Sequence, residues 1–189
     1  MANKVKFGLC NVHIAPITAV SGASITYDTP FAIKGAVNLT LDPEGESADF
    51  YGDNTKYFSE FANQGYSGSL EIALITDEFR TKILGESTDS NGAMTESTND
   101  TIKDFALGFQ IDGDKTNRRY WYYNVSAQRP STAGQTIETS KEPSTDTLNI
   151  TATPRITDNK VRTFLEKTDD NATAYNGFFS EVYEPVVSA

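Results

Sequence analysis

The residue types that could carry out nucleophilic catalysis or bind zinc are scarce in this chain. Cys10 is the only cysteine and His13 the only histidine among 189 residues. A nucleophile usually needs an adjacent base, but side chains three residues apart in an extended segment point to opposite faces. Zinc needs more N and S ligands than one Cys and one His provide. We therefore expect His13 to be a structural or surface residue rather than a catalytic one.

Three further patterns suggest chemistry only weakly. The sequence GYSG at 65–68 approximates the nucleophile elbow of hydrolases, but its second Gly comes one residue too early. Asp112, Asp114 and Asn117 could surround a cation, but they lack EF-hand spacing, which favours a hairpin turn. The 26 acidic residues contain many carboxylate pairs, none of which stands out as that of a glycosidase. We predict a protein that is not an enzyme and uses no cofactor or metal.

Arg118 and Arg119, close to Trp121, could form a stacking platform for single-stranded nucleic acid. The rest of the chain disfavours this function, because 26 acidic residues outnumber 16 basic ones and the net charge is −10. Affinity for a phosphate backbone comes chiefly from Lys and Arg. A negative charge also serves solubility, so it does not identify a function by itself.

Length and composition indicate a single, mainly β domain spanning residues 1–189. The hydrophobic fraction is 38%, and 13 Gly and 7 Pro are typical of strands joined by long loops. A single cysteine excludes an internal disulfide. No run approaches the roughly 20 apolar residues of a membrane-spanning helix, and no secretory leader is recognisable. We expect a protein that is made in the cytosol and does not bind a membrane.

The clearest local prediction is a long β-hairpin over residues 104–130. Apolar residues occupy every second position of its first strand, which is the pattern of a half-buried strand. These residues are Phe105, Leu107, Phe109 and Ile111. Asp112 and Gly113 supply turn chemistry. The second strand, 120–125, is dense in aromatic residues, and Pro130 ends it.

Other elements follow from the same patterns. Segments 36–41, 67–75 and 147–153 alternate between apolar and polar residues, and 160–167 could be a further strand. Thr76 caps a predicted helix over 77–84, which would pack through Phe79 and Ile83 and end at Gly85. A short helical turn is expected within 175–182.

Residues 42–65 interrupt the alternation and are predicted to form a long loop. Compact domains rarely keep an irregular loop longer than about 12–15 residues without a task. It could be an Ω-like loop packed on its own domain, or a loop that docks on another subunit. The candidate contact residues are Asp42, Glu44, Glu46, Phe50, Tyr51, Asp53, Tyr57, Phe58 and Phe61.

Several segments together resemble the major tail protein, or tail tube protein, of long-tailed double-stranded DNA bacteriophages, especially those of Gram-positive hosts. They are KVKFGLCNVHIAPI, TYDTPFAIKGAVNLTLDPEGESADFYGDN, GYSGSLEIALITDEFRTKILGE, FALGFQIDGDK, RRYWYYNVSAQRP, STDTLNITATP and NGFFSEVYEP. The likeness covers nearly the whole chain in the right order.

The resemblance implies a two-sheet β-sandwich with one flanking helix, assembled in the virion as stacked hexameric rings. The rings form a β-lined tube through which DNA passes without specific binding. The loop at 42–65 would reach the neighbouring ring, and an N-terminal arm (about 1–20) and a C-terminal tail (about 168–189) would add subunit contacts. Implied partners are other copies of the chain, the tape-measure protein, the tail terminator and the distal tail protein.

The family likeness also gives roles to two sets of side chains. The hairpin at 104–130 becomes a candidate wall element of the tube, with Arg118, Arg119 and Trp121 as candidate subunit contacts. The candidate lumen-facing residues are polar positions of the alternating strands, namely Asn38, Thr40, Ser69, Glu71, Asn149, Thr151 and Thr153. A carbohydrate- or receptor-binding β-sandwich, suggested by Trp121 and nine Tyr, is the alternative, and a β-sandwich glycosidase is a third hypothesis.

Overall fold

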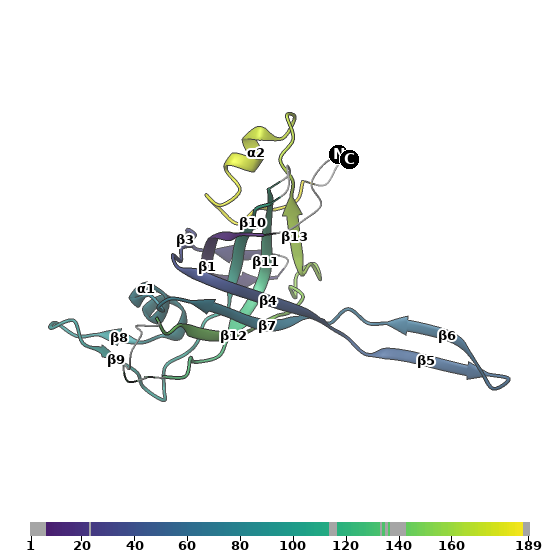
Figure 1. Cartoon of the computed structure of the whole chain (residues 1–189), viewed down its shortest axis with the longest axis horizontal. Helices are drawn as coiled ribbons and strands as arrows, with labels where there is room; N and C mark the ends of the chain where they lie inside the picture. The colour runs from purple at the N-terminus through teal and green to yellow at the C-terminus, as the bar shows by residue number, and fades with distance from the viewer. Residues whose placement is uncertain are drawn as a thin grey trace.

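The computed structural model describes residues 7–22, 24–113, 117–132, 134, 136 and 143–186. The chain is mainly β, as the composition predicts, and most strands join one large antiparallel sheet (Figure 1). The strands of this sheet are β1 (Leu9–Ser21), β2 (Ser24–Tyr27), β3 (Phe31–Ala32), β4 (Ala36–Glu44), β7 (Gly65–Ile72), β10 (Phe105–Ile111), β11 (Arg118–Ala127), β12 (Asp146–Ala152) and β13 (Arg162–Leu165).

The sheet has the order β2-β1-β10-β11-β12-β7-β4, with β3 paired to β1 and β13 paired to β11. Strand β11 pairs with β13 over its first half and with β12 near its end, so the sheet stays hydrogen-bonded where it changes direction. Two short hairpins lie outside it, β5 (Ser47–Gly52) with β6 (Thr55–Phe61), and β8 (Ser87–Thr88) with β9 (Met94–Thr95).

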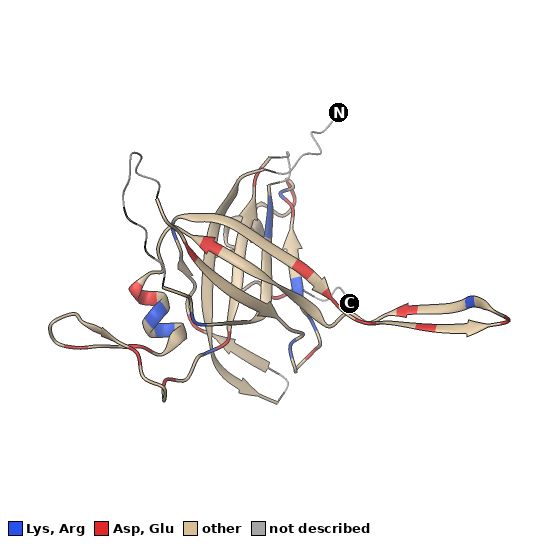
Figure 2. Ribbon diagram, turned by 60° about the horizontal axis from the view of Figure 1, so that its bottom comes forward, with Lys and Arg blue, Asp and Glu red and all other residues tan. Residues whose placement is uncertain are grey.

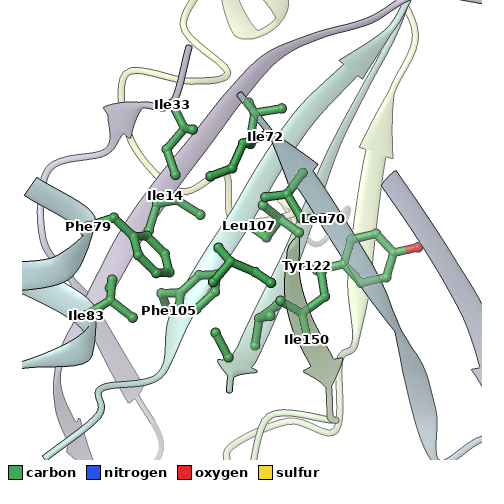
Figure 3. Close-up of a cluster of buried hydrophobic side chains, with 14 of the residues drawn as sticks. Ile14, Ile33, Leu70, Ile72, Phe79, Ile83, Phe105, Leu107, Tyr122 and Ile150 are labelled. Atoms are coloured by element: carbon green, nitrogen blue, oxygen red, sulfur yellow. The ribbon is translucent and has the colours of Figure 1, made fainter. Parts of the chain in front are cut away.

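The main hydrophobic core lies where β4, β7 and β12 pass across β1, β10 and β11 (Figures 1 and 3). Leu70 and Ile150 from the first group and Ile14 and Leu107 from the second are buried in one cluster. The alternation in the sequence accounts for this, since one apolar face of each strand must find cover.

The predicted helix is present with both of its caps. It begins as α1 (Asp77–Phe79), where the Thr76 Oγ1 accepts a hydrogen bond from the Phe79 N–H at 3.3 Å. It continues as one π-helical turn, η1 (Arg80–Leu84), and ends at Gly85 with a φ of 79°. Phe79 and Ile83 are fully buried in the main core, as predicted (Figure 3).

The central hairpin, β10 with β11, is buried on both faces, whereas the sequence predicts a half-buried hairpin with one face free for the tube wall. Phe105 and Leu107 face the main core. Ala106, Trp121 and Tyr123 belong to a second core on the opposite face. The prediction of a free face is wrong because the C-terminal segment covers it.

That cover is the C-terminal strap, which we define as residues 172–186 and which includes α2 (Ala172–Asn176). Side chains of β11 donate hydrogen bonds to its carbonyl groups, from Trp121 Nε1 to Phe178 at 2.7 Å and from the Tyr123 hydroxyl to Tyr183 at 2.9 Å. Buried Phe178 completes the second core. The described part of the predicted tail therefore packs on its own subunit.

Most of the predicted N-terminal arm belongs to the sheet. From Leu9 the chain is strand β1, which lies between β2 and β10 and buries Val12, Ile14 and Ala15. Residues 9–20 are thus part of the sheet, because their apolar positions fill the core. Residues 1–6 of the predicted arm lie outside the described residues.

An ion-pair cluster ties the strap to the preceding segment. The Arg155 guanidinium is only 4% exposed, donates to the Asp158 carboxylate at 2.6 Å (Nη2–Oδ2) and to Glu184 at 3.0 Å (Nη2–Oε2), and lies over the Tyr123 ring. The Arg155 hydrogen bonds lower the pKa of Asp158 from 3.8 to about 2, although burial opposes this shift. A buried guanidinium needs such carboxylates, since an unpaired buried charge is costly.

The lowered pKa predicts how stability depends on pH. A carboxyl whose folded-state pKa is depressed stabilises the fold above its unfolded pKa, and this stabilisation is lost as pH falls from about 4 to about 2. We expect Asp158→Asn to lower the free energy of unfolding at neutral pH by more than the roughly 0.5 kcal/mol typical of surface changes. Its stability should also fall less steeply below about pH 4. Urea unfolding followed by fluorescence of Trp121, the only tryptophan, measures both effects.

Asp169→Asn, which changes an exposed carboxylate, is the matched control and should follow the wild type. Indistinguishable pH profiles for Asp158→Asn and wild type would show that the Asp158 carboxylate contributes no stability.

Candidate functional site

The residues considered for catalysis have structural partners. The Cys10 Sγ lies 3.3 Å from Asp112 Oδ2; burial and this hydrogen bond raise the thiol pKa to about 11, so the thiol is a poor nucleophile. The His13 ring stacks on Phe179 with centroids 4.6 Å apart. Ser67 of the GYSG sequence lies in β7 and pairs with Thr151 of β12 and Asp42 of β4, so it is not at a strand-to-helix turn. No cluster of three or more His, Cys, Asp or Glu occurs in the described ranges, which omit Asp114.

The most distinctive surface is a projecting hairpin, defined as residues 45–64 and built on β5 and β6. It extends away from the sheet (Figure 1). The backbone ladder of β4 and β7 continues into it, because the N–H of Gln64 donates to the carbonyl of Glu44 at 2.9 Å and that of Ala62 to Glu46 at 3.0 Å. The segment is therefore a regular antiparallel ribbon, and the prediction of an irregular loop over 42–65 is wrong.

The turn at its tip explains the regular structure. Asp53 and Asn54 both have positive φ, at 50° and 60°, as in a two-residue type I′ turn, whose twist matches that of the flanking strands. Asp-Asn between Gly52 and Thr55 is a recognisable hairpin signal in the sequence. The surrounding acidic residues obscure it because they break the alternation of apolar and polar positions.

The two faces of the projecting hairpin differ. Phe50 and Phe58 lie directly opposite each other, and Tyr57 is on the same face, since a Cβ built on Gly52 would lie 3.7 Å from the Tyr57 Cβ. We call this the aromatic face; it also carries Glu60, paired with Ala48. The other face holds a polar cluster, in which Asp49 accepts a hydrogen bond from Ser59 at 2.7 Å and pairs with Lys56 at 2.8 Å. The register also places Tyr51 and Phe61 on this second face.

The aromatic side chains of the projecting hairpin are exposed to solvent. Their exposed fractions run from 53% to 80% for Phe58, Phe61, Phe50, Tyr51 and Tyr57. An Ω-like loop packed on its own domain is therefore wrong. Contiguous exposed apolar groups on a monomer usually mark an interaction site, which favours the alternative of docking on another subunit. The ribbon also carries four acidic residues and one Lys, as Figure 2 illustrates.

A second surface is the polar face formed by β4, β7 and β12. The registers align Asn38 with Glu71 and Thr147, and Thr40 with Ser69 and Asn149. Thr151 continues the face beside Ser67, and Thr153 follows the end of β12, where its Oγ1 accepts from Asn124 at 2.8 Å. These strands contain no Lys or Arg. The polar residues selected from the sequence thus come together opposite the core.

The three predicted subunit contacts have partners within the chain. Trp121 has no exposed surface with which to touch another subunit. The Arg119 guanidinium lies 4.1 Å from the Tyr175 ring centroid and donates to the Tyr175 carbonyl. Arg118 pairs with Glu166. The prediction fails for Trp121 because the C-terminal strap covers the strand face that carries it.

The same burial weakens one basis of the carbohydrate-binding alternative, namely Trp121 and the tyrosines beside it in β11. Trp121 and the neighbouring Tyr120, Tyr122 and Tyr123 are all buried, so they offer no stacking platform. No known protein-family model matches the sequence, and no curated protein matches it either. Within the described ranges, no helix combines the length and apolar character needed to cross a membrane.

The exposure of the hairpin aromatics predicts unequal effects on stability. Phe58→Ser should change the free energy of unfolding by no more than about 0.5 kcal/mol, because the residue is already 53% exposed. Phe105→Ser, at a ring that is 1% exposed, should cost about 3–5 kcal/mol or more. Chemical denaturation of both variants at low protein concentration measures the difference. A large loss of monomer stability in Phe58→Ser would mean that the ring packs on its own domain.

Proposed function

We propose that the chain is a non-enzymatic structural subunit that assembles with copies of itself into stacked hexameric rings. On this proposal the rings form the tail tube of a long-tailed bacteriophage, in line with the sequence resemblance. The subunit fold would be the corresponding two-sheet β-sandwich with a flanking helix, located in the virion. The observation that carries the proposal is the projecting hairpin, whose aromatic side chains remain more than half exposed in the described chain.

Physical considerations favour a partner for this hairpin. An isolated two-stranded ribbon is marginally stable in water, and aromatic residues on it have little to gain from solvent. A projecting element that contacts a different surface on the next copy makes a heterologous interface, which generates closed rings or open polymers. A tube of stacked rings combines the two, since each ring is closed and the stack of rings is open-ended.

The polar face suits the wall of a DNA conduit. Double-stranded DNA carries one negative charge per about 1.7 Å of its axis, and Lys and Arg are the residues that bind it. Asp42 and Glu71 lie on or beside this face, whose strands contain no basic residue. Such a wall repels the polymer weakly and keeps it mobile. Contacts with the tape-measure protein, tail terminator and distal tail protein belong to the same proposal.

Assembly gives a direct test. At high concentration the purified protein should show rings or tubes in negative-stain electron micrographs. A variant in which Asn-Gly replaces residues 47–61 closes the ladder with a two-residue turn, so it should keep its fold yet no longer polymerise into tubes. Replacing only Asp53 and Asn54 with Asn-Gly keeps the ribbon and is the matched control.

If the shortened variant formed tubes of normal length, the projecting hairpin would not be needed for assembly. Monomers under all conditions for the wild type, even with the tape-measure protein added, would overturn the proposal itself.

The orientation of the subunit is a separate prediction. A cryo-electron microscopy map of assembled tubes should place Asn38, Ser69 and Asn149 toward the axis, because their strand face lacks cations. A map with these side chains on the outer wall would refute the assignment of the lumen without affecting the tube itself.

A further inference from the structure

A groove of about 420 Å³ opens between the edge strand β4 and the central strands β10 and β11. Its lining contains apolar side chains from two sides, Val37, Leu39 and Leu41 from β4 and Phe109 and Ile111 from β10, beside polar groups of Tyr120, Tyr122 and Arg162. Val37 is 55% exposed, and Leu39 and Leu41 are only partly buried. The volume lies within the range of ligand-binding pockets, about 300–1,000 Å³.

The groove is lined by a cationic side chain, that of Arg162. The Arg162 guanidinium lies 5.1 Å from the Tyr66 ring centroid and donates to the Tyr122 hydroxyl at 3.3 Å. Arg162 forms no ion pair within the described part of the chain, and no Asp or Glu occurs among the described residues that line the groove. The groove therefore suits an apolar group that carries a carboxylate.

The aromatic face of the projecting hairpin has this composition. Phe50, Tyr57 and Phe58 present exposed rings, and Glu60 lies on the same face beside Phe58. The hairpin cannot reach the groove of its own subunit, because it continues β4 away from the sheet (Figure 1). A second copy of the chain is then the partner whose chemistry fits.

Strand β4 also has a free edge at this groove. It ends the sheet order and pairs only with β7 among the described strands, so the backbone groups on its other side have no strand partner. Such edges readily accept an added strand. A ribbon from another subunit can thus gain main-chain hydrogen bonds while its side chains enter the groove.

Resting on the assembly proposed above, we infer that the groove between β4 and β10–β11 is the receptor for the projecting hairpin of a neighbouring copy. Phe50 and Phe58 fill the apolar part, and Glu60 meets Arg162. Donor and receptor are different surfaces of one chain, which makes the contact head-to-tail. Strand β4 carries both, since its start lines the groove and its end leads into the hairpin. Each docking therefore leaves one free hairpin and one free groove for the next copy.

The test is complementation between two variants. The first, Phe50→Ser with Phe58→Ser, loses the donor but keeps the groove. The second, Val37→Glu, places a carboxylate in the receptor at an exposed position but keeps the hairpin. Each alone should be monomeric, whereas their mixture should form one-to-one heterodimers that extend no further, as measured by sedimentation velocity. Val20→Glu, at an equally exposed valine outside the groove, is the matched control and should polymerise like the wild type.

Charge exchange tests the same contact without relying on Val37→Glu. Arg162→Glu and Glu60→Arg should each weaken self-association about tenfold or more, and the double variant should recover most of it, because the pair is re-formed in opposite polarity. Thermal unfolding of each monomer verifies that it is folded.

The outcomes separate the groove from the tube. If Val37→Glu and Arg162→Glu both formed normal tubes, the inference that the groove receives the hairpin would be wrong, while the tube proposal would stand. Heterodimers in the mixture, with a wild type that forms chains but no rings, would support the groove and overturn the tube. If the two variants are folded and their mixture forms no heterodimers, the hairpin does not dock in the groove.

Discussion

The architecture depends on covering both faces of the central hairpin, β10 with β11. Each face carries large apolar side chains, and burial of such surface is the main favourable term in folding. One face is covered by β4, β7 and β12, and the other by the C-terminal strap. These two covers come from segments before and after the hairpin in the chain, so the hairpin holds the subunit together.

Regular backbone hydrogen bonding carries the sheet beyond its core. The ladder of β4 and β7 continues into the projecting hairpin, where no second layer exists to bury side chains. Main-chain pairing and a two-residue turn shape this ribbon, and its aromatic residues remain exposed. The hairpin projects, and its side chains are exposed, because the β4–β7 ribbon extends beyond the strands that pack against it.

Electrostatics within the subunit also affect what it can contact. Arg118, Arg119 and Arg155 are engaged by the strap or by nearby carboxylates. Because these cations are used internally, much of the charge left at the surface is acidic, including that of the hairpin and the polar face. In this setting Arg162, which points to aromatic rings rather than to a carboxylate, is a cation that a second copy could neutralise.

The sequence alone determined the features that depend on neighbours along the chain. Alternation on β4, β7 and β12 correctly brought Asn38, Ser69 and Asn149 to one face, and Thr76 and Gly85 marked the ends of the helix. The scarcity of Cys and His argued against the catalytic sites considered. Only the tertiary structure decided that Trp121 is buried, because its cover is Phe178, 57 residues away. The turn at Asp53 and Asn54 is a local signal for the ribbon at 42–65, but its length was decided by the tertiary structure, because the ribbon continues the pairing of β4 with β7. Local patterns predict which face of a strand is apolar, but distant segments determine what covers it.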